Sequence, residues 1–379
     1  MVQSPLQKYQ PKQEEPCCGP CPPPPSAPHE RAGYEVCPFI DRFIESGAEP
    51  VPKVSTKLGW RDIRGLLRAR AGIMRSEYRV APGLYCTGKP DDNSPVLVTA
   101  NYKLSFDTLR RELSAVDAWV LVLDTRGVNV WCAAAHKTFG TDELISRLQK
   151  IGLEKVVRHR KLILPQLGAP GVDAQQVKKT SGFEVVWGPV RAEDIPGFLE
   201  NPCRPDDAMR RVTFNMAERL VLSPVELSLA LKPSLIILIV MWVLSGIGPW
   251  FFSVDAAWSR WQLFAPVFIA GLLSGTVITP ALMPWLPFRA FYLKGIIASL
   301  PAAGLIVWQH NNISLPELLA LVFACISVSS YGSMNFTGAT PFVSPSGVEK
   351  EMRQAIPVQL FFSLTSVSLW LIIPFIVGR

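Results

Sequence analysis

A cysteine at position 132 lies in the part of this 379-residue chain whose residue types are best suited to chemistry. An apolar run ends at Leu123, a polar turn follows over residues 124–127, and Cys132 then opens an Ala-rich helical pattern. A cysteine in the first turn of a helix lies near exposed backbone amides and the positive end of the helix dipole, which favour its thiolate. The pattern predicts a reactive or metal-ligating sulfur, and the alternative is a small buried hydrophobic residue.

Two further features accompany this cysteine. His136 follows Cys132 by four residues and shares its helical face, so it is either a competing soft-metal ligand or a surface histidine. Beyond Gly140 we predict a new helix that is capped by Thr141 and has Glu143 in its first turn.

The elements that position these residues alternate between apolar strands and amphipathic helices across residues 95–199. This alternation predicts a doubly wound α/β domain with a mostly parallel sheet. The expected strands cover residues 96–98, 118–123, 162–164 and 183–186, and the expected helices cover residues 106–113, 141–148 and 172–179. Ligands bind such sheets beyond the carboxyl ends of the strands, so we expect chemistry in residues 99–103, 124–137, 165–168 and 187–189.

The composition predicts a membrane domain after this soluble part. The chain is 49% hydrophobic and 18% charged, and only six of its 38 Lys and Arg residues follow Lys232. Five apolar stretches, each near the ~20 residues that cross a bilayer, cover residues 233–252, 263–282, 291–309, 315–334 and 356–377. Few ionisable residues interrupt them, which favours an anchor or docking platform over a pump.

The flanking charges predict how the chain is oriented. Basic residues precede the first and fifth stretches and lie between the second and third, which places these segments in the cytoplasm. We therefore expect a multi-pass protein of the cytoplasmic (inner) membrane, with its N-terminus and soluble domain inside and its C-terminus outside. The net charge of +7 without a long basic run favours membrane lipid over nucleic acid as a partner.

The expected domain boundaries follow from these patterns. Residues 1–57 read as a Pro-rich flexible tail, 58–201 as the α/β domain, 202–232 as a linker and 233–379 as five transmembrane helices. Residues 61–79 are basic and amphipathic and predict a helix near a surface. Cys17, Cys18, Cys21 and Cys37 could hold a soft metal or belong to a solvated tail.

The stretch Asn129-Val-Trp-Cys132-Ala-Ala resembles the signature of the corrinoid-binding membrane protein of the bacterial and archaeal mercury-methylation system. Its soluble domain is similar to the corrinoid domain of the corrinoid iron-sulfur protein of the acetyl-CoA pathway. The likeness extends to residues 78–85, 100–107, 138–142, 164–168 and 188–194, and to the five apolar stretches.

The resemblance implies a Rossmann-like corrinoid-binding domain followed by an all-α transmembrane domain of five helices. It implies a cobalamin or related corrinoid held base-off, with Cys132 as lower axial ligand to cobalt and as the catalytic residue. The residues expected to hold the corrinoid are Asn129, Val130, Trp131, Cys132, Ala133, Ala134, Thr138, Gly140, Thr141, Gln166 and Gly168. His136 is the alternative metal ligand.

The resemblance further implies a methyltransferase that passes a cobalt-bound methyl group to Hg(II) and forms methylmercury. Its implied partners are mercuric ion, a methyl-folate-type donor and a ferredoxin-like protein with two [4Fe-4S] clusters that reduces the cobalt. One departure concerns Ala135-His136, which stands where the family motif has Gly-Lys. This leaves two alternatives: a corrinoid methyltransferase with another acceptor, and a non-enzymatic membrane protein that binds a corrinoid or heavy metal.

Overall fold

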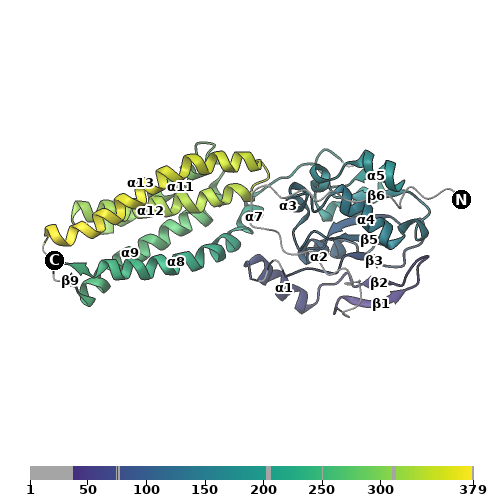
Figure 1. Ribbon diagram of the computed structural model, residues 1–379, viewed down its shortest axis with the longest axis horizontal. Coiled ribbons are helices and arrows are strands. Elements are labelled where there is room, and N and C mark those ends of the chain that lie inside the picture. The colour runs from purple at the N-terminus through teal and green to yellow at the C-terminus, as the bar shows by residue number, and fades with distance from the viewer. Residues whose placement is uncertain are drawn as a thin grey trace. The chain divides into compact units, whose positions relative to one another are not determined.

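The computed structural model describes residues 37–73, 75, 77–201, 206–249, 251–309 and 313–377. The chain divides into two compact units, with the boundary between Val212 and Thr213 and with residues 70–72 assigned to the second unit. The first unit is a mixed α/β sheet domain, and the second is helical (Figure 1). The boundary falls within the linker that we expected at residues 202–232.

The sheet unit contains seven strands and six α-helices among its described residues. The strands are β1 (Ile40–Ile44), β2 (Val51–Val54), β3 (Gly83–Thr87), β4 (Val96–Ala100), β5 (Ala118–Leu123), β6 (Lys161–Leu164) and β7 (Glu184–Trp187). The α-helices are α1 (Trp60–Arg70), α2 (Lys103–Glu112), α3 (Val130–Ala135), α4 (Thr141–Ile151), α5 (Ala174–Ser181) and α6 (Ile195–Glu200). Short 3-10 helices are η2 (Leu153–Lys155), η3 (Gln166–Gly171) and η4 (Ala192–Asp194).

The four strands predicted from apolar runs form one parallel block of the sheet. The strand order is β1-β2-β3-β5-β4-β6-β7, and β4 pairs in parallel with both β5 and β6 while β6 pairs in parallel with β7. Ala100 lies opposite Leu123, and Leu164 lies opposite Trp187, so these strands end at one edge. The expected alternation of strands and helices is confirmed.

The sheet is mixed rather than mostly parallel, which corrects part of the prediction. β3 runs antiparallel to β5, and β1 runs antiparallel to β2. We predicted a tail through residue 57, yet β1 and β2 join the sheet. Two features made these strands hard to predict. The residues before them are Pro-rich, and β1 carries charged side chains on an exposed edge of the sheet. Residues 1–36, with Cys17, Cys18 and Cys21, lie outside the described residues, as does Cys203.

Helices cover both faces of the sheet because side chains of each strand alternate between two apolar cores. Leu121 and Leu123 pack on one face with residues of α3, α4 and α5, whereas Val120 and Val122 pack on the other face with α2 and α6. All six residues of β5 are buried. The unit is thus a three-layer sandwich with β5 and β4 at its centre.

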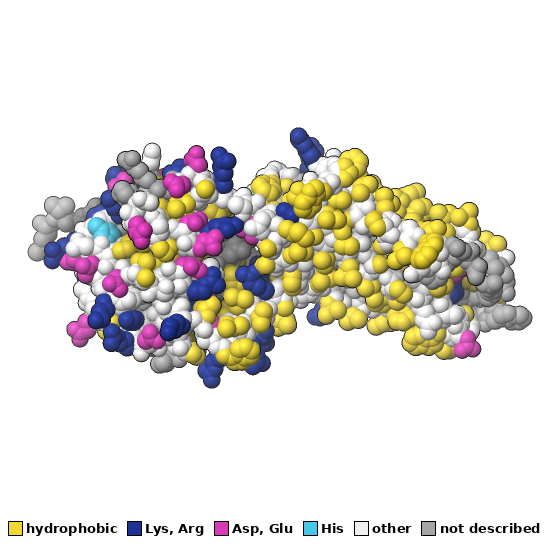
Figure 2. Space-filling model, turned by 180° about the vertical axis from the view of Figure 1, so that it is seen from behind, with side chains coloured by type: hydrophobic (Ala, Val, Ile, Leu, Met, Phe, Trp, Pro, Cys, Tyr) yellow, Lys and Arg dark blue, Asp and Glu magenta, His cyan; other side chains and the backbone are white. Residues whose placement is uncertain are grey.

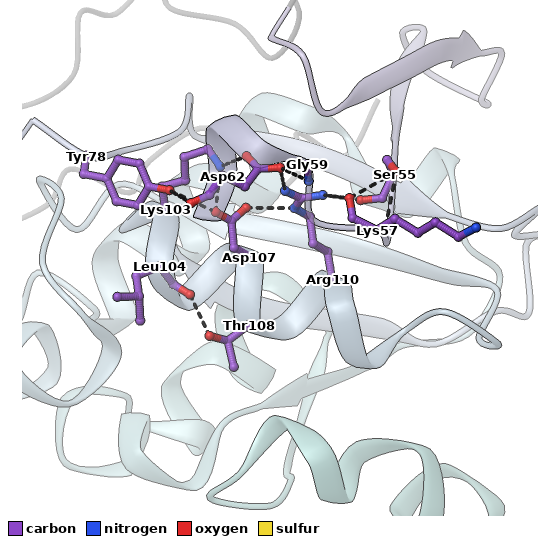
Figure 3. A network of polar contacts seen from close by, with 10 residues as sticks. All are labelled: Ser55, Lys57, Gly59, Asp62, Tyr78, Lys103, Leu104, Asp107, Thr108 and Arg110. Atoms are coloured by element: carbon purple, nitrogen blue, oxygen red, sulfur yellow. Dashed lines mark hydrogen bonds and ion pairs between the residues drawn. The ribbon is translucent and has the colours of Figure 1, made fainter. Parts of the chain in front are cut away.

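A buried network of ion pairs joins α1 to α2 (Figure 3). Arg110 is fully buried, and its Nε and Nη2 lie 2.8 Å from Asp107 Oδ1 and Asp62 Oδ2. Lys103 Nζ lies 2.6 Å from Asp62 Oδ1 and from Asp107 Oδ2. Two cations and two carboxylates therefore compensate one another, as buried charges require.

The helix expected over residues 61–79 is shorter than predicted. α1 ends at Arg70, and Gly72 follows with φ +77°, a left-handed conformation that glycine adopts without strain and that ends a helix. Tyr78 and Arg79 instead run beside the start of α2, where Lys103 N–H donates to the Tyr78 carbonyl oxygen at 2.9 Å.

The helical unit contains five helices long and apolar enough to cross a membrane, so the chain is a multi-pass membrane protein. Its elements are α7 (Met216–Leu220), α8 (Ser223–Ser245), β8 (Ile247–Gly248), β9 (Phe251–Phe252), α9 (Val254–Leu273), the π-helix η5 (Ser274–Ile278), α10 (Thr279–Leu282), α11 (Phe291–Gln309), α12 (Leu315–Phe336), η6 (Thr337–Ala339) and α13 (Pro345–Val377). Figure 2 shows hydrophobic side chains covering most of the visible face of this unit, while charged side chains are frequent on the sheet unit.

The first apolar stretch differs from its prediction. We expected a helix over residues 233–252, but α8 ends at Ser245, and β8 and β9 form a short antiparallel pair after it. Gly246, Gly248 and Pro249 end the helix because none of them favours a helix interior. The unit is therefore not entirely α-helical.

Small residues let α9, η5 and α12 approach closely. A methyl group on Gly275 would lie 2.4 Å from the Ser329 carbonyl oxygen, and one on Gly271 would lie 2.7 Å from that of Cys325. Such contacts are typical of transmembrane helices, where close packing replaces the hydrophobic effect as the source of association.

We expect Arg110→Ala to destabilise the sheet unit by about 3–5 kcal/mol, because it leaves two buried carboxylates with Lys103 as their one remaining cation. The neighbouring Arg111→Ala is the matched control, since the Arg111 side chain is 55% exposed and its loss should change stability by about 1 kcal/mol or less. Pulse proteolysis of the detergent-solubilised chain across a urea series measures both changes. Equal midpoints for the two variants would contradict a structural role for the network.

Candidate functional site

The carboxyl edge of the parallel strands gathers the polar segments in which we expected chemistry. β4, β5, β6 and β7 all end at this edge, and β3 begins there because it runs antiparallel to β5. The segment before β3 therefore joins the site, as the 2.9 Å hydrogen bond from Val80 N–H to the Asn101 carbonyl oxygen shows. The topology places residues 77–83 beside the loops that follow β4 and β5.

Asn101 organises the loop between β5 and α3. Its Oδ1 accepts hydrogen bonds from the backbone N–H groups of Thr125 at 3.0 Å and Gly127 at 2.9 Å, and its Nδ2 donates to Asp124 Oδ1 at 3.0 Å. Arg126 and Gly127 have φ values of +58° and +76°, so the loop turns sharply here. Our sequence interpretation did not single out Asn101, although a polar residue directly after a strand that is apolar except for Thr99 was a usable signal.

Cys132 lies in the first turn of α3, as predicted. Asn129 is the N-cap of this helix, and its Oδ1 accepts the Cys132 backbone N–H at 2.9 Å. The sulfur is half-buried and free of any disulfide. An Asn at this position satisfies an amide that the helix itself leaves unpaired, which fixes the orientation of the first turn.

The protonation state of Cys132 differs from the expectation. Burial raises the pKa of the Cys132 thiol above its ordinary value, although hydrogen bonding to Asn129 and the positive charge of Arg75 oppose this shift. Desolvation thus outweighs the helix terminus, and the unliganded protein carries a neutral thiol near neutral pH. A metal ion that binds this sulfur would displace its proton.

The helix that carries Cys132 packs on the segment after β6. α3 contacts both η3 and β4. A methyl group on Gly171 would lie 2.9 Å from the Ala134 Cα and 2.2 Å from the Phe139 carbonyl oxygen, so only glycine fits there. Strand order reverses between β4 and β6, which is where ligands bind in doubly wound sheets.

Gln166 carries an unsatisfied polar atom at this reversal. Its Oε1 is buried and has no hydrogen-bond partner among the described residues. Buried polar atoms are nearly always paired in native proteins, so an orphan beside a predicted ligand edge indicates that a ligand or water completes it. The predicted site residue Gln166 therefore has a physical reason to face a bound group.

Several predicted site residues pack in or against the apolar core. Ala133 and Ala134 are buried in the apolar core, and Gly168 is buried where a methyl group would lie 2.5 Å from the Phe139 ring. Val130 packs against the same core, whereas Trp131 is half-buried. The small residues thus allow α3 and η3 to approach, and the prediction that they hold a cofactor is not tested by this packing.

The start of α4 differs from the prediction. Gly140, not Thr141, is the N-cap, because Thr141 already has helical geometry and its Oγ1 accepts the Asp173 backbone N–H at 2.8 Å. Thr138 Oγ1 donates to the Ala133 carbonyl oxygen at 3.3 Å. Glu143 accepts the Asp124 backbone N–H at 2.9 Å and thereby ties α4 to the loop after β5.

His136 lies at the far end of α3 from the cap. It is the C-cap residue, it is exposed, and its backbone N–H donates to the Cys132 carbonyl oxygen at 3.1 Å. Its neighbours Ala135 and Lys137 are also exposed, and Lys137 has φ +59°. These three residues form an exposed end to the helix, and a ligand role for His136 stays a prediction.

The described residues offer no metal centre made by protein alone. No three His, Cys, Asp or Glu side chains converge within them. Cys86 is fully buried, and burial raises the pKa of its thiol to about 12.

Comparisons with known proteins find similarity in the part of the chain that contains this site. Residues 70–199 match the family described as CO dehydrogenase/acetyl-CoA synthase delta subunit. The acetyl-CoA decarbonylase/synthase complex subunit gamma of Methanopyrus kandleri is 34% identical over 128 residues, which are 33% of this chain and 27% of the relative. The corresponding subunit of Methanothermobacter thermautotrophicus is 32% identical over 144 residues, covering 37% of this chain and 31% of the relative.

The similarity covers only part of this chain and part of each relative. This chain spans between a quarter and a third of the length of these relatives, and the family match lies within the sheet unit. The sheet unit is thus related to subunits of acetyl-CoA decarbonylase/synthase complexes, which agrees with the resemblance to an acetyl-CoA pathway protein. Membership of the mercury-methylation family stays a prediction.

We expect Cys132 to be alkylated slowly by iodoacetamide at about pH 8, with a rate that still rises above about pH 9, because only the thiolate reacts. Asn129→Ala should slow labelling further at about pH 8, since it removes a hydrogen bond that lowers the thiol pKa. Asp173→Ala is the matched control, because it removes the N-cap of α5 without touching Cys132. Peptide-resolved mass spectrometry separates Cys132 from the other cysteines, and half-maximal labelling below about pH 8 would contradict the raised pKa.

Proposed function

We propose that this chain is a membrane-anchored corrinoid protein that carries a methyl group and transfers it to Hg(II). The observation that carries the proposal is a capped, half-buried Cys132 on α3, a helix that contacts η3, where the orphaned Gln166 oxygen lies after β6. Similarity to acetyl-CoA decarbonylase/synthase subunits over residues 70–199 supports the corrinoid and methyl-transfer part of this proposal.

The residues present fit a cobalamin or related corrinoid. A corrinoid carries its own nitrogen ligands to cobalt, so one protein sulfur would be a sufficient contribution from the chain. Cys132 would supply that sulfur, and Asn129 would hold the first turn of α3 in place. The unpaired side-chain oxygen of Gln166 would accept a hydrogen bond from an amide N–H of the bound group.

The corrinoid and the protein chain would contribute different parts of the chemistry. When bound, a methylated corrinoid supplies a methyl group that can leave toward an electrophilic soft metal ion such as Hg(II). Cys132 would lose its proton on ligation and would then donate electron density as a thiolate, which favours that departure. The buried surroundings that raise its pKa would also limit the access of water to the sulfur.

The proposal includes partners and an orientation. A ferredoxin-like protein with two [4Fe-4S] clusters would return electrons after each transfer, and a methyl-folate-type donor would restore the methyl group. The basic residues between the apolar helices support placement of the sheet unit in the cytoplasm and the C-terminus outside.

One observation supports a different methyl acceptor. Ala135 and His136 are both exposed at the end of α3, where the resemblance implies Gly-Lys. An Ala methyl group would crowd a ligand that approaches the backbone, and His136 carries the charge of a lysine only when protonated. A corrinoid methyltransferase with another acceptor is therefore the second candidate, and storage or delivery of a corrinoid or heavy metal is the third.

We expect the purified chain to bind cobalamin with a base-off, thiolate-dependent ultraviolet-visible spectrum that Cys132→Ala abolishes. Cys37→Ala is the matched control, because Cys37 is another half-buried cysteine of the sheet unit and lies outside the site. Methylated protein mixed with Hg(II) should then lose its methyl group to mercury. A Cys132→Ala protein that keeps both the spectrum and the transfer would contradict the assigned ligand.

The outcomes of this experiment separate the three candidates. A thiolate-dependent spectrum without methylmercury would favour another acceptor, provided that a methyl donor and reductant drive turnover. The same spectrum without any turnover would favour storage. Absence of bound corrinoid in the wild-type chain would overturn all corrinoid-based proposals.

We expect the double substitution Ala135→Gly and His136→Lys to raise the rate of mercury methylation if these residues set the acceptor. Both side chains are exposed and neither packs in the core, so the substitutions act only on the local surface at the end of α3. The measurement compares initial rates of methylmercury formation with those of the control Lys137→Arg, which keeps the charge beside the same turn. Equal rates in all three proteins would mean that positions 135 and 136 are neutral variation.

A further inference from the structure

Helix α1 of the sheet unit exposes its large apolar side chains. Trp60 is 75% exposed, Leu67 is 60% exposed and Ile63 is 40% exposed. Because these residues are three, four and seven positions apart, they form one stripe along the helix. A surface helix of a soluble domain normally turns such a stripe inward, so α1 has the opposite arrangement.

Polar contacts fix α1 in this orientation. Asp62 points inward and pairs with Lys103 and Arg110, as Figure 3 shows. Gly65 lies against Tyr78, where a methyl group would come within 2.6 Å of the aromatic ring, and Ala69 is buried. Rotation of α1 to bury Trp60 and Leu67 would break these ion pairs and place larger side chains against Tyr78.

Basic side chains flank the apolar stripe on one side. Arg61, Arg64 and Arg68 are all exposed and share a second stripe by the same helical spacing. The single acidic residue of α1 is Asp62, which is turned inward. The outer face of α1 therefore combines a tryptophan, two aliphatic side chains and three cations, which is typical of helices that lie in the headgroup region of a bilayer.

A bilayer surface is always within reach of this unit. The sheet unit ends at Val212, and the first apolar span begins at Met216. A connection of this length extends over about 14 Å at most. The chain thus keeps α1 at high local concentration near a membrane, whichever partner the site serves.

We propose that the outer face of α1 docks on an anionic lipid surface, with Trp60, Ile63 and Leu67 at the acyl boundary and the three arginines on phosphate groups. Arginine pairs well with phosphate oxygens, and tryptophan favours the interface between headgroups and acyl chains. The docking would hold the sheet unit on the bilayer by a second attachment besides its covalent link to the spans.

Amide hydrogen exchange of residues 60–70 tests this docking in the full chain. The chain is reconstituted in vesicles of phosphatidylcholine alone, or with about a third of the lipid replaced by phosphatidylglycerol, and exchange is followed by mass spectrometry. We expect exchange in α1 to be about tenfold slower in the anionic vesicles. The triple variant R61E/R64E/R68E should lose this difference, while exchange in β4 and β5 stays slow and reports an intact fold.

A matched variant controls for the change of charge. R158E/K178E/K179E reverses three exposed cations outside α1 and should keep the slowing in anionic vesicles. The variant W60S/L67S should reduce it without altering the charge. Equal exchange of wild-type α1 in both vesicle types would overturn the proposal. Protection that persists in neutral vesicles and in R61E/R64E/R68E would also overturn it, because protein rather than anionic lipid would then cover the helix.

Discussion

The candidate site depends on the way one buried amide side chain is satisfied. Asn101 directly follows β4 and is fully buried. Its side-chain oxygen accepts hydrogen bonds from two backbone N–H groups of the loop after β5, and its NH₂ group donates to Asp124. Each such group would cost about 1–3 kcal/mol if left unpaired. The loop is therefore held to β4, and the start of α3 follows from it. The position of Cys132 is thus set by a neighbouring strand as well as by its own helix.

The parts of the fold that could be predicted are those encoded locally. β4, β5, β6 and β7 are short apolar runs between polar turns, and α2, α4 and α5 have amphipathic spacing, so each was expected close to its observed bounds. The first turn of α3 was also expected, because Asn129 and the alanines around Cys132 are a local signal. Prediction succeeded where one segment carries its own pattern.

The features that escaped prediction arise from contacts between distant segments. β1 and β2 become strands only by pairing with each other and with β3, and their own sequences are charged or contain proline. Thr141 was expected to cap α4, but Asp173, 32 residues later, uses its hydroxyl group. The burial that raises the Cys132 pKa also comes from tertiary packing, so a helical pattern alone favoured the wrong protonation state.

The buried charges of the helical unit bear on whether it transports anything. Arg219 donates to the carbonyl oxygens of Pro280 and Ala281 at 2.7 and 3.1 Å, and Lys294 donates to that of Met283 at 2.6 Å. Glu351 accepts the Tyr292 backbone N–H at 2.8 Å, at the start of α11. The two cations thus compensate the carboxyl end of α10, and the carboxylate compensates the amino end of α11. A proton or ion relay needs ionisable groups spaced along the spans. The three buried charges gather instead at one connection, and the half-buried Arg260 donates to the carbonyl oxygens of Ser245 and Trp370. This arrangement favours an anchor over a relay.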